Sequence, residues 1–513
     1  MKASIRQRIE KRKLRIERRL ARRRKRQAKR TGYITPVINT RNIKYELSDR
    51  SRGLVYGGVP LFVDLARQVG LAAAIDRRLK LLKIHLPYHE SDHVLNFAVN
   101  ALCEGTCLED IELRRGDEAF LDALGAETIP DPTTAGDFCR RFSEADIRAL
   151  QEAVNHSRLN VWNRQPDEFF DEAVIDADGT LTITTGECKE GMDISYKGTW
   201  GYHPLVVSLA NTGELLSLVN RSGNRPSEEG AAEELDRAAG QCRQGGFRRI
   251  CFRGDTAFSQ TQHLDRWNAA GDVSFYFGYD ALPNLKELAE KLPESSWTRL
   301  ERPARHQVKT EPRQKPANVK REVVRRREYL HLELKSEEVA EFGYRPVACK
   351  TAYRMIVVRK NISQERGDNV LFDDVRYFFY ITNDRDKTPA EVVFFCNGRC
   401  DQENLIAQLA GGVRALAAPL DSLLSNWAYM LMTSLAWTLK AWAALCLPVC
   451  GRWREQHEAQ RRTLLRMEFR TFVNHFVKLP CQIIEQGRRT VLRVLNWNPQ
   501  LPVFFRMCGV LRC

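Results

Sequence analysis

Three acidic residues that lie far apart in the sequence occupy positions typical of a metal site. Asp178 ends a short apolar run, Asp255 ends a second one, and Glu403 lies in a helix-like segment. A carboxylate at the end of a buried strand is costly unless a metal ion or a partner compensates its charge. Mg²⁺ prefers oxygen ligands and keeps water molecules, so a few carboxylates hold it without His or Cys. The three acids are therefore predicted to bind two Mg²⁺ ions, or Mn²⁺ in their place, for phosphodiester chemistry.

The first acid of this predicted site has two candidates. Asp176 lies two residues before Asp178 in the same apolar run. Side chains alternate along a strand, so both carboxylates point to one face and Ala177 points to the other. Periodicity does not choose between them, and Asp176 stays the alternative first acid.

The segments that carry the first two acids predict an α/β fold. The strand with the first acid is followed by a hairpin over residues 203–220, which turns at Asn211. A helix expected from Ser227 to Gly245 leads to the strand before Asp255, and a further helix and strand follow. Hairpin-connected strands followed by alternating helices and strands describe a mixed sheet flanked by helices. In such sheets the chemistry gathers at strand ends, where these acids lie.

Shifts in composition divide the chain into six predicted regions. They are a basic arm at 1–32, a helical DNA-binding or oligomerisation domain at 50–165, the first part of a catalytic core at 170–280, a mainly β insertion at 281–372, the second part of the core with the third acid at 373–450, and a C-terminal helical region at 451–513. A purely structural role is the alternative for the helical domain. The insertion is rich in Lys and Arg over residues 305–327, where it could follow a phosphate backbone or be only a solvated hairpin. The helix-like run that carries Glu403 extends from about Ala390 to Leu409.

The positive charge of the chain is concentrated at its N-terminus. The formal net charge is +15, and residues 1–30 hold 16 Lys and Arg against two acids, which leaves the rest near neutral. Such a segment repels itself, so we expect it to be disordered or loosely helical until phosphates neutralise it. Its expected contacts with double-stranded DNA are Arg22, Arg23, Arg24, Lys25 and Arg26. A merely solvated charged arm is the alternative.

Two features of the sequence exclude other classes of protein. Residues 422–439 carry no charge, but Asn426 interrupts them and Asp421 and Lys440 bracket them, so we predict a buried helix and no membrane contact. No Gly-Lys dipeptide occurs, which excludes a P-loop and ATP-driven work. The N-terminus also lacks the apolar core of a signal peptide, so the chain is expected in the cytoplasm.

Five stretches of the sequence carry a resemblance to a known family. They are residues 175–180 (Ile-Asp-Ala-Asp-Gly-Thr), 252–258 (Phe-Arg-Gly-Asp-Thr-Ala-Phe), 397–403 (Asn-Gly-Arg-Cys-Asp-Gln-Glu), 130–142 (Pro-Asp-Pro-Thr-Thr-Ala-Gly-Asp-Phe-Cys-Arg-Arg-Phe) and 201–205 (Gly-Tyr-His-Pro-Leu). The first three resemble the acidic motifs of DDE transposases of bacterial insertion sequences, in particular the group numbered thirteen-eighty, which is related to the group numbered four. The resemblance covers about residues 50–450.

This resemblance implies more than the residues do alone. It implies an RNase H-like catalytic core, with a β insertion between the second Asp and the Glu, and Mg²⁺ dependence. It implies cut-and-paste DNA cleavage and strand transfer at terminal inverted repeats of an insertion sequence. It also implies an oligomer, expected to be a homodimer, on double-stranded DNA that includes the transposon ends and the target, in association with a bacterial nucleoid.

The match around the third acid is incomplete. The family signature has Tyr, then Arg three positions later and Glu four beyond; Arg399 and Glu403 fit, but Cys396 replaces Tyr. The later Lys of the signature falls at Ala410, and Arg414 is expected to make its phosphate contact. Arg399 and Asn397 are the other DNA contacts expected in this segment.

Two alternative functions stay open, and Cys396 and Ala410 motivate the first of them. One is a catalytically decayed or domesticated relative that binds DNA without cutting it. The other is an RNase H-like nuclease with the same metal chemistry, which would cut DNA regardless of end sequences.

Overall fold

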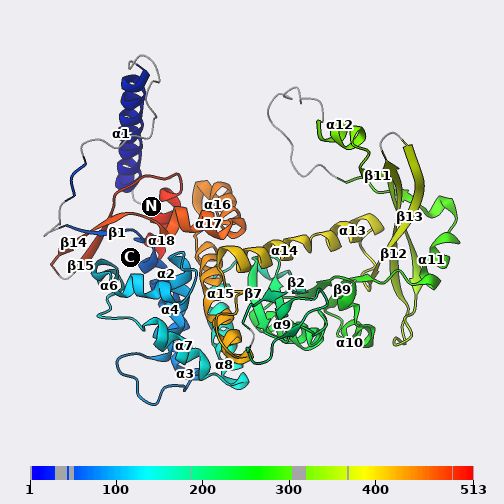
Figure 1. Cartoon of the computed structure of the whole chain (residues 1–513), viewed down its shortest axis with the longest axis horizontal. Helices are drawn as coiled ribbons and strands as arrows, with labels where there is room; N and C mark the ends of the chain where they lie inside the picture. The colour runs from blue at the N-terminus through cyan, green and yellow to red at the C-terminus, as the bar shows by residue number, and fades with distance from the viewer. Residues whose placement is uncertain are drawn as a thin grey trace.

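A large sheet forms the centre of the computed structural model. The structure describes residues 3–28, 43–45, 51–186, 188–302, 319–366, 369–487 and 489–511. Helices lie on both faces of the sheet, and a mostly helical part lies at one end of the molecule (Figure 1). Among the described residues, no helix is long and apolar enough to cross a membrane.

The sheet has nine strands in the order β10-β11-β12-β13-β9-β8-β2-β6-β7. Their bounds are β2 (Glu172–Gly179), β6 (Leu205–Leu209), β7 (Glu214–Val219), β8 (Arg249–Gly254), β9 (Val273–Tyr279), β10 (Thr298–Arg299), β11 (Leu330–Tyr344), β12 (Tyr353–Arg366) and β13 (Asn369–Thr382). Strand β2 runs antiparallel to β6 and parallel to β8, which is itself parallel to β9. The prediction of a mixed sheet flanked by helices is confirmed.

The pairing of β2 with β8 places the first two acids at one edge of the sheet. Asp176 pairs in register with Arg253, so the ends of the two parallel strands lie side by side. The hairpin of β6 and β7 is joined to β2 by the Asn211 side chain, which accepts from the backbone N–H of Val174 and donates to the carbonyl of Glu172. Gly213 completes that turn in the left-handed region, at φ 70°, where a side chain would be strained.

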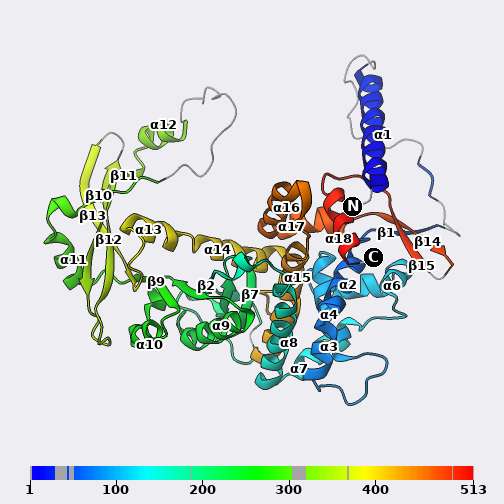
Figure 2. The ribbon, with the colours of Figure 1, turned by 180° about the vertical axis from the view of Figure 1, so that it is seen from behind.

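Different helices cover the two faces of the core sheet. Helices α13 (Pro389–Asn397) and α14 (Cys400–Ala407) run across one side, and α9 (Ala231–Gly245) and α10 (Leu264–Ala269) lie on the other (Figures 1 and 2). The helix predicted to begin at Ser227 is α9, which begins four residues later, at Ala231. The helix-like run predicted from Ala390 to Leu409 is interrupted at Gly398, and a short π-helix, residues 408–412, follows α14.

The region predicted as a β insertion extends the core sheet. Strand β13 crosses the predicted boundary at residue 372 and pairs with β9 of the core, while β11 and β12 pair beyond it. Two helices, α11 (Pro283–Glu290) and α12 (Val319–Arg326), also belong to this region. Residues 303–318, which hold part of the predicted basic stretch, lie outside the described residues.

The N-terminal part of the described chain is helical, as expected. Its helices are α2 (Val59–Gln68), α3 (Leu71–Arg78), α4 (Glu90–Leu102), α5 (Glu112–Arg115), α6 (Glu118–Leu124), α7 (Pro132–Arg140) and α8 (Glu144–Trp162). At the start of α7, Asp131 Oδ1 accepts from the backbone N–H of Thr134 at 2.9 Å and Pro132 occupies the first turn. Proline fixes φ and the carboxylate satisfies a free N–H, so this motif starts a helix.

The C-terminal region is not wholly helical, and the prediction for residues 451–513 is wrong in that respect. It contains α16 (Arg454–Arg466), α17 (Phe469–Phe472) and α18 (Leu501–Val510), but also a hairpin of β14 (Cys481–Gln486) and β15 (Arg489–Val494). Strand β14 pairs with β1 (Arg52–Leu54), which precedes the N-terminal helices. The two ends of the chain are thus packed together.

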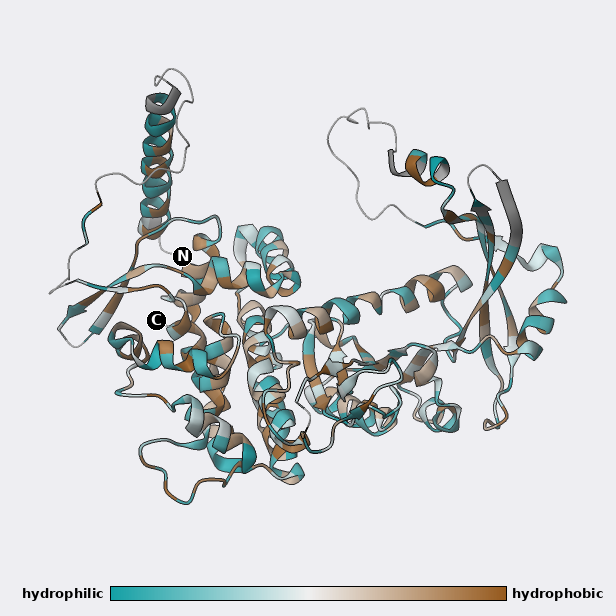
Figure 3. Cartoon of the chain, in the orientation of Figure 1, coloured by the Kyte–Doolittle hydropathy of each residue, from teal (hydrophilic) through white to brown (hydrophobic). Residues whose placement is uncertain are grey.

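The basic arm is a helix rather than a disordered segment. Helix α1 (Ala3–Ala28) projects from the body, and hydrophilic residues dominate its surface (Figure 3). Arg12 Nη1 donates to the carbonyl of Val494 at 2.9 Å, and Ile9 packs against the core. These contacts hold the first half of α1 against the C-terminal hairpin.

Helix α15 (Leu423–Leu445) contains the uncharged stretch and is buried along its length, as predicted. Lys440 is 1% exposed, donates from Nζ to the carbonyl of Leu465 at 2.9 Å and lies 3.7 Å from the Trp437 ring centre. Burial lowers the pKa of Lys440 from 10.5 to about 7.

This pKa makes stability depend on pH in a defined window. Between pH 7 and 10.5 the unfolded state holds a proton that the folded state has lost, so stability rises with pH. Lys440→Met is expected to remove that rise and to stabilise the protein at pH 6 by about 2 kcal/mol. Urea unfolding at pH 6 and pH 10 measures both effects, and an equal gain at the two pH values would contradict the assignment.

Candidate active site

Asp178 lies at the end of β2, where its carboxylate contacts the guanidinium of Arg399 at the N-terminus of α14. Arg399 Nη1 donates to Asp178 Oδ2 at 3.0 Å, and the Asp178 side chain is 15% exposed. Burial raises the pKa of Asp178 to about 6; Arg399 opposes this shift, and the neighbouring charges of Asp255 and Glu403 add to it. The electrostatics therefore place all three predicted acids in one neighbourhood.

Asp176, the alternative first acid, has a different environment. It is 1% exposed, and Arg253 holds both of its carboxylate oxygens, with Nε and Nη2 each at 2.7 Å. Such a bidentate pair uses the oxygens that a metal ion would need. The structure therefore favours Asp178 over Asp176 as the first acid.

Arg253 also positions the helices that cover the site. Its Nη1 donates to the carbonyl of Phe395 in α13 at 2.9 Å, and its guanidinium lies 5.0 Å from the Phe395 ring centre. Just after α13, a Cβ at Gly398 would lie only 2.5 Å from Arg253 Nη1, so a side chain there would displace the Arg253 guanidinium. The pair of Asp176 and Arg253 thus ties β2 and β8 to α13. Sequence reasoning missed Arg253, although it immediately precedes the Gly-Asp of the second motif.

Asp255 follows β8 and begins η3 (Thr256–Ser259), a short 3-10 helix. Its Oδ1 accepts from the backbone N–H of Ala257 at 3.1 Å, and its side chain is partly exposed. Because β8 is parallel to β2 and adjacent to it, Asp255 lies at the same edge of the sheet as Asp178.

Glu403 lies on α14, one turn after Arg399. Its side chain is 61% exposed, and Glu403 Oε1 lies 3.7 Å from Arg399 Nη2. Arg399 therefore stands between the first and third predicted acids and bridges their charges. The exposed Glu403 side chain has room to change its direction.

Gln402 anchors the helix that carries Glu403. It is 1% exposed, donates from Nε2 to the carbonyl of Val206 in β6 at 3.0 Å and accepts from the hydroxyl of Ser208. The sequence did not indicate this role for Gln402, because a Gln next to an acidic motif carries no signal of its own. The two hydrogen bonds fix α14 over the sheet.

We predict that Gln402→Leu loosens this helix. It removes the donor to the Val206 carbonyl and leaves the buried Ser208 hydroxyl without its acceptor, so the protein should lose about 2 kcal/mol of stability, and DNA cleavage should fall about tenfold. Thermal unfolding and a cleavage assay measure the two effects, with Asn404→Leu, an exposed position of the same helix, as the control. Equal behaviour of the two variants would show that Gln402 does not position α14.

The three acids do not form a ready-made metal site. Within the described part of the chain, no three Asp, Glu, His or Cys side chains are arranged to hold a metal ion. The donor chemistry nevertheless fits a divalent cation, because carboxylate oxygens are its preferred ligands. Burial raises the pKa of Asp178 although the charge of Arg399 opposes this shift. A cation at Asp178 would replace Arg399 as the partner of the carboxylates.

The other residues expected to contact DNA near the site differ in their surroundings. Asn397, at the end of α13, has a buried amide nitrogen without a hydrogen-bond partner. Arg414 is exposed, with φ 59°, and its carbonyl accepts from the hydroxyl of Tyr429 at 3.3 Å. Cys396 is buried, which raises its pKa to about 12. It belongs to the core and presents no surface on which a base could stack.

The basic residues predicted to contact DNA in the arm lie on α1, away from these acids in the view of Figure 1. Those whose side chains are described are all exposed: Arg22, Arg23, Arg24 and Lys25. The side chain of Arg26 lies outside the described part of the structure. The structure does not bring this group together with Asp178.

Comparison with known proteins identifies the family. The family model described as transposase DDE domain group 1 matches residues 53–512. The chain belongs to this family. Transposases of this kind cleave and transfer DNA strands, and the earlier resemblance to DDE transposases is confirmed at this level. No curated protein matches the chain.

One solved structure is similar over much of its length. The cryo-EM structure of the piggyBac transposase synaptic complex with hairpin DNA is 9% identical, with a TM-score of 0.36, over 82% of this chain and 83% of that chain. At this TM-score the likeness carries no argument about fold or function.

Proposed function

We propose that the chain is a cut-and-paste transposase that cleaves and joins DNA at the terminal inverted repeats of an insertion sequence. The observation that carries the proposal is that Arg399 contacts Asp178 and Glu403, and that the charge of Asp255 acts on Asp178, in a chain of the transposase DDE family. In keeping with the sequence resemblance, we assign it to the bacterial group numbered thirteen-eighty.

The order of the core strands supports an RNase H-like catalytic domain. Strands β7, β6 and β2 form an antiparallel meander, and β8 and β9 continue it in parallel with β2. Helix α14 then crosses the edge where β2 and β8 end. This arrangement supplies one acid from the middle strand, one from its parallel neighbour and one from the crossing helix.

In the proposed site, Asp178, Asp255 and Glu403 would hold two Mg²⁺ ions, or Mn²⁺ in their place. Such ions activate an attacking oxygen and stabilise the leaving one. The residues of the chain provide the rest: β2 and β8 hold two acids at fixed spacing, and Gln402 fixes the helix that bears the third. While no ion is bound, Arg399 balances the charge of the carboxylates. Once ions are bound, Arg399 would be free to contact a DNA phosphate.

The proposed partner is double-stranded DNA, both at the transposon ends and at the target. The exposed Arg and Lys of α1, together with Asn397, Arg399 and Arg414, would contact it, and a homodimer would hold the two ends. Phosphate contacts of this kind position DNA but do not read its sequence.

A cleavage and joining assay tests the proposal. The purified chain with Mg²⁺ should cut DNA that carries the inverted repeats flanking its gene and join the ends to a target, and a chelator should abolish both reactions. Equal cutting of random DNA would identify a nuclease instead. Binding without cutting would identify a decayed or domesticated relative.

A further inference from the structure

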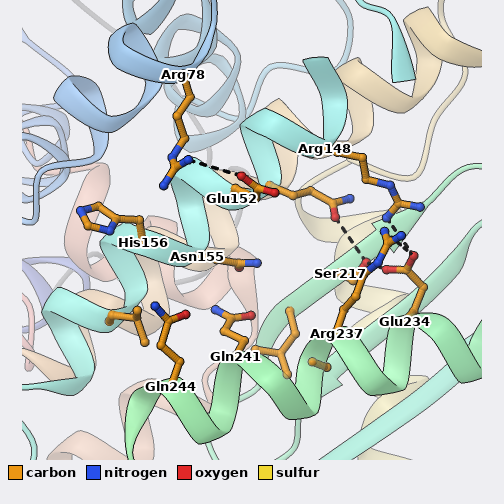
Figure 4. Close-up of a pocket in the computed structure, with 14 residues that line it drawn as sticks. Arg78, Arg148, Glu152, Asn155, His156, Ser217, Glu234, Arg237, Gln241 and Gln244 are labelled. Carbon is orange, nitrogen blue, oxygen red and sulfur yellow. Dashed lines mark hydrogen bonds and ion pairs between the residues drawn. The ribbon is translucent and has the colours of Figure 1, made fainter. Parts of the chain in front are cut away.

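A polar pocket outside the predicted catalytic site lies between the N-terminal helices and the edge of the sheet. It has a volume of about 580 Å³, and its lining comes from α3, α8, β7 and α9 (Figure 4). This volume falls in the usual range of small-molecule sites, about 300–1,000 Å³, and such sites favour boundaries between structural units. None of the three predicted catalytic acids lines it.

One side of the pocket holds two arginines that share a single carboxylate. Glu234 is 3% exposed and lies 2.8 Å from Arg148 Nη1 and 3.2 Å from Arg237 Nη1. The Ser217 hydroxyl also donates to it. Arg148 is further held over the Trp427 ring, 5.0 Å from its centre. Arg148 has a second carboxylate neighbour in Glu144, at 3.9 Å, so the exposed guanidinium of Arg237 is the one available to a ligand.

The floor of the pocket holds a polar group that lacks a partner. Gln241 is only 8% exposed, and its amide nitrogen makes no hydrogen bond. Figure 4 shows its side chain rising from α9 into the pocket, toward Asn155 of α8. Buried amides are normally satisfied, so this amide has a donor to offer a ligand in the pocket.

The opposite rim adds further donors. Arg78 of α3 lies 3.3 Å from Glu152 of α8, and both side chains are partly exposed. His156 and Gln244 also line the pocket (Figure 4). Donor groups outnumber carboxylates, so the pocket suits a ligand rich in hydrogen-bond acceptors and negatively charged.

We propose that this pocket binds the phosphate group of a nucleotide, either free or as part of a DNA strand. Guanidinium groups bind phosphate oxygens with two parallel hydrogen bonds, and Arg237 and Arg78 are exposed enough to do so. The amides of Gln241, Asn155 and Gln244 have the donors and acceptors that match a base or a sugar. This site is separate from the proposed catalytic one and does not depend on it.

Binding measurements on the full chain test this inference. Isothermal titration with adenosine monophosphate and with inorganic phosphate should detect binding in the wild type. Arg237→Gln should weaken it about tenfold or more, and Gln241→Leu about fivefold, because each removes a hydrogen bond to the ligand. Arg266→Gln is the matched control, since Arg266 is similarly exposed and paired with Asp236 outside the pocket.

A second arm distinguishes the two sources of phosphate. If a DNA strand enters the pocket, Arg237→Gln should lower the salt dependence of duplex binding by about one phosphate contact. If only free nucleotides bind, that dependence stays unchanged while nucleotide affinity falls. The inference would be overturned if the wild type bound neither nucleotide nor phosphate at millimolar concentration and if Arg237→Gln bound duplex DNA as Arg266→Gln does. Asp178→Asn should leave nucleotide binding intact, so a failed catalytic assignment would not affect this result.

Discussion

Asp178→Asn is expected to lower the rate of Mg²⁺-dependent DNA cleavage about 10³-fold or more while the protein stays folded. Asparagine keeps the shape of the side chain but removes the charge that a divalent cation needs. A metal-stabilised transition state is worth several kcal/mol, and each 1.36 kcal/mol changes the rate tenfold. The measurement is cleavage of DNA that carries the element's ends, together with DNA binding and thermal unfolding.

Asp176→Asn is the matched control, two residues away on the same strand. It leaves Arg253 buried without its carboxylate, and breaking such a pair costs about 3–5 kcal/mol. We therefore expect Asp176→Asn to lower the stability of the protein. Its cleavage activity should fall only to the extent that the protein is unfolded. If Asp176→Asn were stable and inactive while Asp178→Asn retained cleavage, the roles of the two acids would be reversed.

Glu214→Gln is expected to destabilise the protein by about 3–5 kcal/mol, the largest effect of any change away from the catalytic site. Glu214 lies at the start of β7, and its carboxylate accepts from four donors. They are Arg158 Nε at 3.1 Å, Trp162 Nε1 at 3.0 Å, Trp442 Nε1 at 2.8 Å and the Thr212 hydroxyl at 2.7 Å. The side chains of Glu214 and Arg158 are both fully buried. An amide at this position offers one acceptor where two are needed and turns its own N–H groups toward donors.

Urea unfolding measures this loss, which is large beside the usual total stability of about 5–15 kcal/mol. Glu172→Gln is the matched control, because Glu172 pairs with Arg249 at 3.5 Å on the surface and should contribute less than about 1 kcal/mol. The double variant Arg158→Leu, Glu214→Leu should lose less stability than the sum of the losses caused by Arg158→Leu alone and Glu214→Leu alone. Strict additivity would show that the ion pair is not the source of the effect.

The sequence predicted the sheet and the segments that bear the acids, because those depend on local pattern. The apolar runs before Asp178 and Asp255, the turn at Asn211 and the start of α7 at Pro132 are signals contained within a few residues. The predicted mixed sheet follows from their order. The assignment of Asp178, Asp255 and Glu403 as catalytic residues stays a prediction.

Other features depend on contacts between distant residues, which a local pattern does not contain. The choice between Asp176 and Asp178 rests on Arg253, which is 77 residues further along the chain. The contact that ties α13 to the sheet comes from the same arginine. The hairpin of β14 and β15 was missed because its β14 strand pairs with β1, more than 400 residues earlier. The helical arm is held against that hairpin because Arg12 donates to the carbonyl of Val494 in β15.

The strands β11, β12 and β13 project from the end of the molecule opposite α1 (Figure 2). They are joined to the core by backbone pairing of β13 with β9 over residues 379–382 and of β9 with β8, which ends just before Asp255. The inner ends of the projecting strands therefore belong to the same sheet as the strand that precedes the second acid. A partner bound to the outer part of those strands would be connected to Asp255 through this sheet.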